Sequence, residues 1–218
     1  MPKVSIITVT SLRPQLLSQA IASLNAQSSQ DFEWIVINDG EDITTKQLIS
    51  TSHLNFPHTY LDMLHSDNGF SLCYGRNRGV VMAQGAIVTY LDDDNTFKPN
   101  FVAETIAFFE NHPQINYAMP IQQRRRDVVQ DGVVVKWGKE FFSPTSNSTV
   151  EDFISDYELI DSNGFAHRNT NDLSLGWNPD LKTYIDCEFF LKCINRWGRE
   201  SFAINPVILV DINALWEN

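Results

Sequence analysis

Short apolar runs alternate with helical patterns through the first half of the chain, and this order constrains the fold more than any other feature. The runs predict strands, and the patterns between them predict amphipathic helices. The predicted strands cover residues 4–10, 32–37, 58–62 and the run before Asp92, and the predicted helices cover residues 14–27, 44–54, 72–83 and the stretch between Pro99 and Asn111. Strands that alternate with helices lie parallel to one another. The predicted fold class is therefore α/β, with a mainly parallel sheet covered by helices on both faces.

The second half departs from this alternation. A strand is predicted over residues 115–121 and a helix over residues 181–197. Between them, Asp131-Gly132 separates two valine-rich runs, as is typical of a hairpin turn. We interpret residues 124–150 as an insertion that shapes a pocket wall. The length of 218 residues favours one large domain over two full ones.

The composition excludes several classes of function. The chain has 16 Lys and Arg against 27 Asp and Glu, a net charge of −11, which argues against nonspecific binding to nucleic acid or to an anionic membrane. Cys73, Cys187 and Cys193 show no C-x-x-C spacing, which favours free thiols in a reducing compartment. Residues 1–10 lack a signal peptide, and no run approaches the ~20 apolar residues of a membrane span. We expect a soluble cytoplasmic protein, with peripheral contact to a membrane through a lipid acceptor left open.

Three consecutive carboxylates, Asp92, Asp93 and Asp94, follow the apolar run at residues 88–91. The run predicts a buried strand, and open α/β sheets bind ligands at the carboxyl ends of their strands. Three like charges in one place disfavour one another's ionised form unless a cation is near. Carboxylate oxygens suit Mg²⁺ or Mn²⁺ shared with the phosphates of a nucleotide. The acidic triplet therefore predicts a divalent metal as cofactor and a nucleotide as ligand.

Polar residues also follow two other predicted strands. The first strand ends at Thr10 and Ser11, and the second ends at Asn38 and Asp39. Because parallel strands entered from the same side finish at the same edge, we expect these residues and the acidic triplet to share one crevice. A late helix opens with a further carboxylate, Asp186.

These segments, in this order and spacing, resemble the family 2 glycosyltransferases of the GT-A fold over about residues 3–198. The matching segments are Val4-Ser5-Ile6-Ile7 with Thr10, residues 31–40 (DFEWIVINDG), Gly75-Arg76-Asn77-Arg78-Gly79, the DxD motif Asp92-Asp93-Asp94, and residues 176–181 (GWNPDL) ahead of Asp186. The resemblance implies a single GT-A domain over residues 1–218. Its nucleotide-sugar-binding half would be residues 1–98, and its acceptor-side half would be residues 99–218.

The resemblance also implies an activity, which is transfer of a sugar from a nucleotide diphosphate donor to an acceptor hydroxyl with inversion at the anomeric carbon. UDP is the donor nucleotide that the resemblance suggests first. A divalent metal, Mn²⁺ or Mg²⁺, would stabilise the charge that grows on the departing diphosphate. The acceptor would be a saccharide or a lipid-linked saccharide, and neither nucleic acid nor an integral membrane segment is expected. Whether the protein forms a homodimer is left open.

The motif positions imply roles at the predicted crevice. Asp94 matches the last Asp of the DxD motif and is expected to bind the metal directly. Asp92 and Asp93 are expected to hold ribose hydroxyls or metal-bound water, and Asp39 is expected to contact the base or the ribose. The remaining nucleotide-binding positions are Thr10, Ser11 and Arg76. Arg76 has an alternative as the partner of a nearby carboxylate.

Asp186 is the expected general base, because inversion by direct displacement needs a carboxylate opposite the leaving group to take the acceptor's proton. It matches the Asp of the family's Glu-Asp pair. The Glu of that pair is Ile185 here, and the Asp that often precedes Asp39 in the family is Asn38. An acidic residue in a first helical turn can also simply cap the helix. Trp177 is expected to form an acceptor platform, with ordinary core packing as its alternative.

Two other functions compete with glycosyl transfer. A phosphatase of the haloacid dehalogenase type would use Asp92 and Asp94, since Asp92-Asp93-Asp94-Asn95-Thr96 fits the D-x-D-x-T signature of that class. That signature normally follows the first strand, whereas three predicted strands precede it here. A noncatalytic nucleotide-sugar-binding module would account for Ile185 and Asn38.

Overall fold

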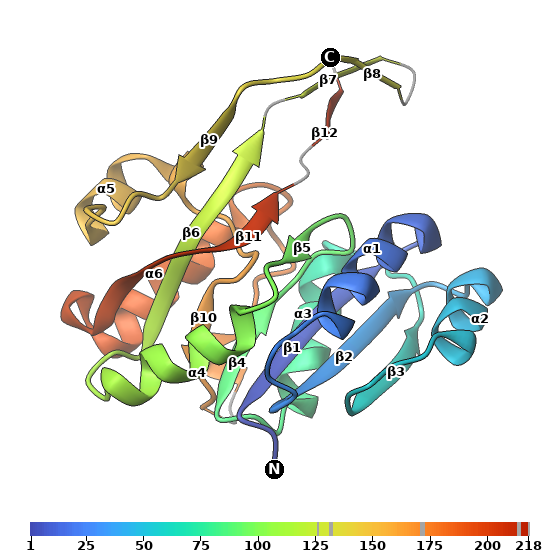
Figure 1. Cartoon of the computed structure of the whole chain (residues 1–218), viewed down its shortest axis with the longest axis horizontal. Helices are drawn as coiled ribbons and strands as arrows, with labels where there is room; N and C mark the ends of the chain where they lie inside the picture. Colours follow the sequence, from blue (N-terminus) through green and yellow to red (C-terminus); the bar gives the residue numbers. More distant parts are fainter. Residues whose placement is uncertain (126, 131–132, 171–172, 213–214, 218) are drawn as a thin grey trace.

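The computed structural model describes residues 1–125, 127–130, 133–170, 173–212 and 215–217. Its central sheet has the strand order β3-β2-β1-β4-β10-β6-β11-β5, with β9 paired to β6 (Figure 1). The strands of this sheet are β1 Val4–Thr10, β2 Phe32–Asp39, β3 His58–Met63, β4 Ile87–Tyr90, β5 Thr96–Phe97, β6 Tyr117–Arg125, β9 Glu140–Ser143, β10 Ala166–Arg168 and β11 Phe202–Ile212. The α-helices are α1 Pro14–Asn25, α2 Ile43–Thr51, α3 Ser71–Met82, α4 Phe101–Asn111, α5 Val150–Ser155 and α6 Ile185–Trp197, and the 3₁₀ helices are η1 Tyr157–Leu159, η2 Leu173–Leu175 and η3 Arg199–Ser201.

The strands of the first half are parallel, as their alternation with helices predicts. β1 pairs with β2 on one side and with β4 on the other, and β2 pairs with β3. Alternate side chains of a strand point to opposite faces of the sheet, so that Val4 and Ile6 join one hydrophobic cluster while Ile7 and Val9 join another. The carboxyl ends of β1, β2 and β4 consequently lie at one edge of the sheet.

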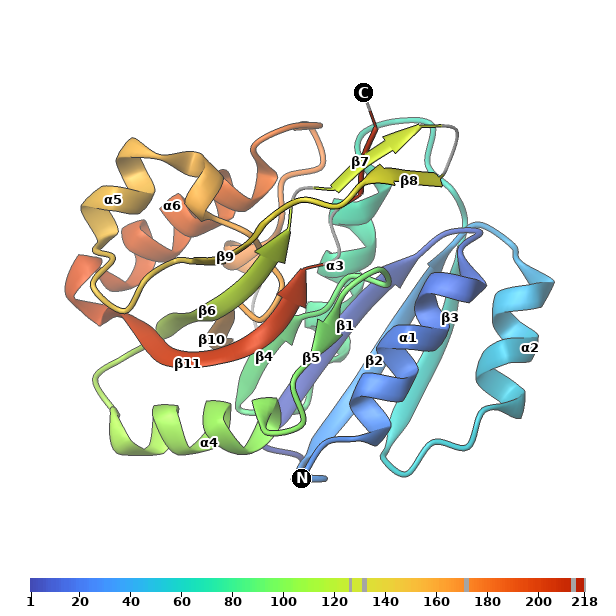
Figure 2. The same cartoon turned by 45° about the horizontal axis from the view of Figure 1, so that its top comes forward.

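Helices cover both faces of this sheet (Figures 1 and 2), which confirms the predicted α/β class. α1, α2 and α4 pack on one face, and α3, α5 and α6 pack on the other. In α1 the buried side chains are Leu17, Ala20, Ile21 and Leu24. This spacing places four apolar side chains on one side of the helix, so that the helix can cover the sheet while its other side faces solvent.

Helix α3 approaches β1 closely because it carries glycines where it faces the strand. A Cβ atom at Gly75 would come within 2.8 Å of the Val9 methyl carbons, and one at Gly79 would come within 2.5 Å of an Ile7 methyl carbon. Real Cβ atoms do not approach so closely, since interiors are already close-packed. The two glycines therefore set the distance between α3 and the sheet, and Arg76 lies on the segment between them.

Antiparallel strands enter the sheet in the second half, where the sequence predicts fewer elements. β10 lies between β4 and β6 and is antiparallel to both, and β5 is antiparallel to β11. β11 runs parallel to β6 with register shifts between Asn205 and Val210. β10 has only three residues. Such a strand is too short to show a pattern of alternating side chains, and long-range pairing alone defines it.

The predicted insertion at residues 124–150 forms an arm that extends from the central sheet (Figure 1). Its strands β7 Asp127–Gln130 and β8 Val133–Lys136 pair antiparallel, as the predicted hairpin requires, whereas the Asp131-Gly132 turn lies outside the described residues. Strand β12 Leu215–Glu217 pairs with β7 and completes a separate three-stranded sheet.

The predicted helix over residues 181–197 begins four residues later, at Ile185. Tyr184 precedes it in the left-handed region, with φ 58° and ψ 24°, and a right-handed helix cannot include a residue in that conformation. α6 has 13 residues. None of the helices that the structure describes combines the length and apolarity needed to cross a bilayer.

Candidate active site

The ends of β1, β2 and β4 meet at one edge of the sheet, as the sequence predicts. The Thr10 hydroxyl donates a hydrogen bond of 2.6 Å to Asp93 Oδ2. The next residue, Ser11, donates through its hydroxyl to the backbone oxygen of Asp39 at 3.0 Å. The loop after β1 therefore joins the acidic triplet to the end of β2.

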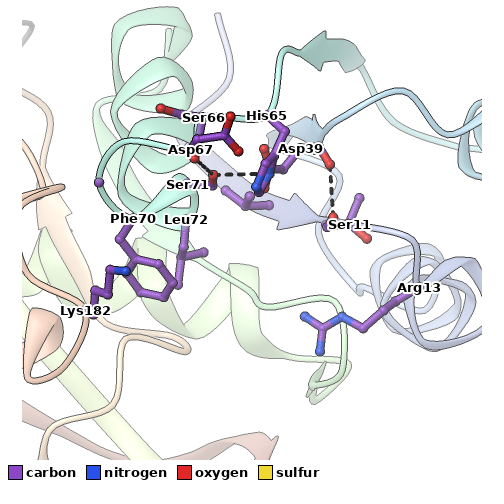
Figure 3. A pocket seen from close by; sticks show the side chains of 13 residues that line it. Ser11, Arg13, Asp39, His65, Ser66, Asp67, Phe70, Ser71, Leu72 and Lys182 are labelled. Carbon is purple, nitrogen blue, oxygen red and sulfur yellow. Dashed lines mark hydrogen bonds and ion pairs between the residues drawn. The ribbon is translucent and has the colours of Figure 1, made fainter.

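A cavity of about 600 Å³ opens at this edge (Figure 3). Its volume lies within the ~300–1,000 Å³ typical of small-molecule sites. The lining consists of Val9, Thr10, Ser11, Arg13, Asp39, His65, Ser66, Asp67, Gly69, Phe70, Ser71, Leu72 and Lys182. The segment at 65–72 supplies much of this lining. None of the described residues of the insertion at 124–150 lines this cavity, and the expectation that the insertion shapes a pocket wall stays a prediction.

Asp39 lies in the cavity wall with one carboxylate oxygen paired and the other without a partner. The residue is 8% exposed. Its Oδ2 accepts a hydrogen bond of 2.9 Å from His65 Nδ1, and this partner fixes the proton on Nδ1 because a carboxylate can only accept. Its Oδ1 is buried and has no hydrogen-bond partner among the described residues. A buried acceptor without a partner is rare in folded proteins, and here it adjoins a cavity large enough for a ligand.

Asp93 anchors the first loop and does not face the cavity. Its side chain is fully buried, with Thr10 on Oδ2 and the Arg13 guanidinium 2.6 Å from Oδ1. Burial raises the pKa of Asp93 to about 6, although the Thr10 hydrogen bond and the Arg13 charge act to lower it. In this structure the Asp93 carboxylate is held by Thr10 and Arg13, and its expected contact with ribose or metal-bound water stays a prediction.

Asp94 is the most exposed carboxylate of the triplet, at 34%. Burial and the neighbouring charge of Asp92 raise its pKa. The Arg13 Nη1 atom lies 3.3 Å from its Oδ2, so that one guanidinium contacts both Asp93 and Asp94. No sequence pattern marks Arg13 as part of the site, because only the folded loop places it beside a residue 81 positions later in the chain.

Arg76 lies beneath the cleft and joins two carboxylates from different parts of the chain. Its side chain is 3% exposed, and its guanidinium pairs with Asp92 at 2.8 Å and with Asp186 at 3.2 Å. It also donates to the Ser162 hydroxyl at 2.7 Å. The side chain therefore shows the alternative in which it pairs with carboxylates, and its expected contact with the nucleotide stays a prediction. Burial alone would lower the pKa of an arginine, but the two carboxylates keep it charged.

Asp92 has a second fixed partner, Asn163, which no motif in the sequence indicates. The Asn163 side-chain amide donates to Asp92 Oδ2 at 2.9 Å, and the Asp92 backbone N–H donates to Asn163 Oδ1 at 2.7 Å. These two reciprocal hydrogen bonds hold the backbone and the carboxylate of Asp92 in place. Asp92 keeps 28% of its side chain exposed, toward the edge where Asp94 lies.

Trp177 packs in the core, as its alternative interpretation predicts. It is 2% exposed, its ring stacks on Phe189 at 4.1 Å with an interplanar angle of 2°, and the Arg76 guanidinium lies 4.3 Å from its ring centroid. Its expected role in acceptor binding stays a prediction. Trp177 supports Arg76 through a cation–π contact, which gains strength where water is excluded.

Asp186 is the second residue of α6 and is 30% exposed. Burial raises its pKa to about 6, and the charges of Asp161 and Asp92 act in the same direction, whereas Arg76 opposes them. A carboxylate with a raised pKa and a partly exposed side chain is suited to take up a proton. Ile185, which replaces the family's Glu, is 8% exposed and packs in the core.

Comparison with known proteins identifies the family. The family model described as "Glycosyl transferase family 2" matches residues 5–169. The chain belongs to glycosyltransferase family 2. The region of this family 2 glycosyltransferase that matches includes β2, the acidic triplet, Arg76 and nearly all of β1.

Individual relatives agree with this assignment. The chain is 33% identical over 99 residues to the GalNAc(5)-diNAcBac-PP-undecaprenol beta-1,3-glucosyltransferase of Campylobacter jejuni, an alignment that covers 44% of this chain and 30% of the relative. The structure of S. aureus TarS 1–349 in complex with UDP-GlcNAc superposes with a TM-score of 0.72 at 17% identity, covering 96% of this chain and 58% of that one. The mannosyltransferase PcManGT of Pyrobaculum calidifontis, in complex with GDP-Man and Mn²⁺, gives a TM-score of 0.63 at 14% identity over 93% of this chain and 56% of that one.

The chain spans only part of the length of its relatives. Alignments with five of the curated glycosyltransferases cover between 30% and 37% of their lengths. The structural neighbours share the GT-A fold, which confirms the fold predicted from the motifs. Family membership and the position of Asp92, which follows the fourth strand of the chain, do not favour the phosphatase alternative.

The acidic edge of this glycosyltransferase fits a divalent cation that phosphate oxygens help to bind. In the part of the chain that the structure describes, no group of three or more His, Cys, Asp or Glu side chains is arranged to hold a metal by itself. Asp94 offers one partly exposed carboxylate. It lies beside the charge of Asp92 and already pairs with the Arg13 guanidinium. Mg²⁺ needs only one or two carboxylates when phosphates and water supply its other ligands. The donor set at Asp94 satisfies that condition.

Proposed function

We propose that this protein is an inverting glycosyltransferase that moves a sugar from UDP to an acceptor hydroxyl with the help of a divalent metal. One observation carries the proposal: the buried Arg76 guanidinium pairs with Asp186 on α6 and with Asp92 of the acidic triplet. The candidate base is thereby held beside the edge where a diphosphate would bind. Family membership supports glycosyl transfer in general, and the donor, the metal and the stereochemistry are our inference.

Asp186 would act as the general base. Its carboxylate would accept the proton of the acceptor hydroxyl while that oxygen attacks the anomeric carbon from the side opposite the diphosphate. Arg76 holds Asp186 in place and favours its ionised form. Arg76 also pairs with Asp92. The shared guanidinium would therefore keep the distance between Asp92 and Asp186 fixed.

Asp94 would hold the metal together with the donor diphosphate. A bound divalent cation would stabilise the negative charge on the leaving diphosphate as a Lewis acid. Arg13 contributes a further positive charge on the same wall and is 47% exposed, so that it can contact a phosphate without leaving the cavity. The complex of PcManGT with GDP-Man and Mn²⁺ supports the choice of metal.

The Asp39–His65 pair favours uracil as the base of the donor. Guanine presents two parallel N–H donors, which match both oxygens of a carboxylate, whereas uracil presents a single ring N–H. Here His65 occupies Oδ2, and only the buried Oδ1 is without a partner among the described residues. A base with one N–H would satisfy that oxygen and leave the His65 bond intact. The complexes of TarS with UDP and with UDP-GlcNAc agree with this choice.

A thermal-shift comparison of UDP, CDP, ADP and GDP, each with and without Mn²⁺, tests the donor assignment. A ligand that binds only the native state raises the melting temperature. We expect UDP to give the largest shift, and we expect Mn²⁺ to increase it. In His65→Phe the preference for UDP over GDP should fall about tenfold, since guanine can then use both Asp39 oxygens.

His53→Phe serves as the matched control for this comparison, because His53 does not line the cavity. It should leave the nucleotide preference unchanged. Equal shifts with all four nucleoside diphosphates in the wild-type protein would contradict the assignment of uracil, and no shift with any of them would favour a module that has lost nucleotide binding.

The rate of transfer is expected to fall in acid with an apparent pKa of about 6. A base must be ionised to accept a proton, and burial raises the pKa of Asp186 to about 6. The rate should therefore rise with pH through this value and become constant above ~7. Initial rates at saturating donor across this range, with UDP binding measured at each pH, test the assignment. A rate that stays constant while UDP binding persists would exclude Asp186 as the titrating base.

The two departures from the family pattern do not favour a noncatalytic module. Ile185 packs in the core next to Asp186 without replacing a charged group of the cleft. The Asn38 amide donates to the Gly40 carbonyl at 2.8 Å and to Asp62 at 3.0 Å, so that it stabilises the turn that carries Asp39. Both carboxylates that the mechanism needs are in place beside these substitutions.

We assign residues 1–98 to donor binding and residues 99–218 to acceptor binding. The acceptor is proposed to be a saccharide or a lipid-linked saccharide, because the Campylobacter relative is named for an undecaprenol-linked substrate. An acceptor of the second kind would place the enzyme at the cytoplasmic face of a membrane, in contact with it through the acceptor lipid.

A further inference from the structure

Two exposed tyrosines meet on the acceptor side of the molecule. The rings of Tyr157 and Tyr184 have centroids 4.7 Å apart and an interplanar angle of 83°. Tyr157 is 50% exposed and Tyr184 is 59% exposed. The two residues are far apart in sequence, and their contact leaves about half of each side chain open to solvent.

One segment of the pair carries the candidate base, and the other carries a residue that binds Arg76. Tyr184 immediately precedes α6, two residues before Asp186. Tyr157 begins the 3₁₀ helix η1, and the same segment continues to Ser162, which accepts a hydrogen bond from Arg76. Arg76 in turn pairs with Asp186. The aromatic pair and the base therefore rest on the same two segments, joined by one guanidinium.

The backbone at Tyr184 has a conformation that is unfavourable for a bulky side chain. Among the described residues other than glycine, positive φ occurs at Leu12 and Tyr184. A bulky residue in the left-handed region is unfavourable, and such strain concentrates where a side chain has a function. Glycine or asparagine would fit this position better, and the exposed tyrosine ring adds little to the core. The conformation directs the chain so that α6 begins immediately afterwards at Ile185.

We propose that Tyr157 and Tyr184 bind a pyranose ring of the acceptor and place its hydroxyl beside Asp186. This inference rests on the proposed function and extends it to the acceptor. An aromatic face covers the apolar C–H groups of a sugar, and a phenol hydroxyl can bond to the sugar's hydroxyls. The two rings lie at nearly a right angle and form a corner. A pyranose ring could pack into this corner against the face of one tyrosine and the edge of the other. A tyrosine hydroxyl is protonated near neutral pH, so both phenols can donate hydrogen bonds to the sugar.

Saturation-transfer NMR with simple glycosides tests the site directly. The probes are the methyl glycosides of glucose, galactose, mannose and N-acetylglucosamine at millimolar concentration, in the presence of UDP and Mn²⁺. We expect transfer to the ring C–H protons of at least one glycoside with the wild-type protein. In Tyr157→Ala and in Tyr184→Gly, binding of that glycoside should weaken about five- to tenfold. Tyr157→Phe should keep most of it, because the ring face is retained.

The same variants separate ligand binding from folding. Tyr184→Gly relieves the left-handed backbone, so its melting temperature should be unchanged or higher while glycoside binding falls. If Tyr184 served the fold alone, Tyr184→Gly would lower the melting temperature and leave glycoside binding by the folded protein unchanged. Leu191→Ala is the control on α6, since Leu191 is 40% exposed and lies further along that helix. It should leave glycoside binding unchanged.

The outcomes distinguish this inference from the proposed function. Undiminished glycoside binding in both tyrosine variants, or no binding of any glycoside to the wild-type protein, would overturn the acceptor site. The thermal shift with UDP is measured in parallel on the same samples. If UDP binding persists while glycoside binding is absent or does not depend on the tyrosines, the acceptor site fails and the donor assignment stands. If UDP fails to bind the wild-type protein, the proposed function itself fails.

Discussion

Asp186→Asn is expected to reduce glycosyl transfer by ~10²- to 10⁴-fold, the usual contribution of a general base. Asparagine keeps the size of the side chain but cannot accept the acceptor's proton at this position. UDP should bind as before, because Asp186 does not line the nucleotide cavity, to which the described segment just before α6 contributes Lys182 alone. The measurement is the rate of UDP release from a UDP-sugar and an acceptor that the wild-type enzyme uses, together with the thermal shift produced by UDP.

Glu188→Gln provides the matched control for this variant. Glu188 lies two residues further along α6 and pairs with Lys192 at 2.9 Å, an arrangement typical of neighbouring turns on a helix surface. Its neutralisation should change the rate by only a few-fold. A transfer rate in Asp186→Asn equal to that of the wild type would remove Asp186 from the mechanism, and an equal loss in both variants would point to a general effect of charge on α6.

Arg76→Met should destabilise the native state by about 2–4 kcal/mol, because it leaves two carboxylates without their shared cation. The expected loss is somewhat smaller than for two wholly buried partners, since Asp92 and Asp186 are 28% and 30% exposed. Urea unfolding of the donor-free protein measures the change. The variant should also show a higher apparent pKa of transfer than the wild type, because Arg76 acts to lower the pKa of Asp186.

Two further variants test the origin of this loss. Adding Asp92→Asn to Arg76→Met removes one uncompensated charge and should recover part of the stability, a coupling that a double-mutant cycle quantifies. Arg199→Met breaks an exposed ion pair with Glu151, whose side chains are 57% and 67% exposed, and should cost less than ~1 kcal/mol. If Arg76→Met were as mild as Arg199→Met, the buried network would not stabilise the fold as described.

The first half of the fold could be predicted because its signals are local. β1 and β2 are short, mainly apolar runs, and α1 places Leu17, Ala20, Ile21 and Leu24 on one side of the helix. The order of strands and helices then fixes the parallel pairing. The second half depends on contacts between distant residues. β10 is defined by its position between β4 and β6, and α5 begins at a capping box formed by Thr149 and Asp152, within a stretch whose composition is typical of a polar loop.

The candidate site was predictable where function follows from position at the end of a strand. Asp39, the acidic triplet and Asp186 could be proposed from motif and spacing, and their assigned roles remain predictions. Side chains whose place depends on tertiary packing could not be assigned in the same way. Arg76 and Trp177 are polar or amphipathic residues that the sequence places near ligands, yet both are buried. His65, Arg13 and Asn163 act through partners that are distant in sequence, and no local pattern marks them.

The two glycines of α3 have a consequence for the charges of the cleft. Gly75 and Gly79 leave no space for a methyl group between the helix and β1, and Arg76 extends from this tightly packed segment to Asp92 and Asp186. An alanine at either glycine would move the helix outward and carry the guanidinium away from both carboxylates. Two glycines thus determine how close the Arg76 guanidinium lies to Asp92 and Asp186. Its distance from Asp186 in turn affects the proton affinity of that carboxylate.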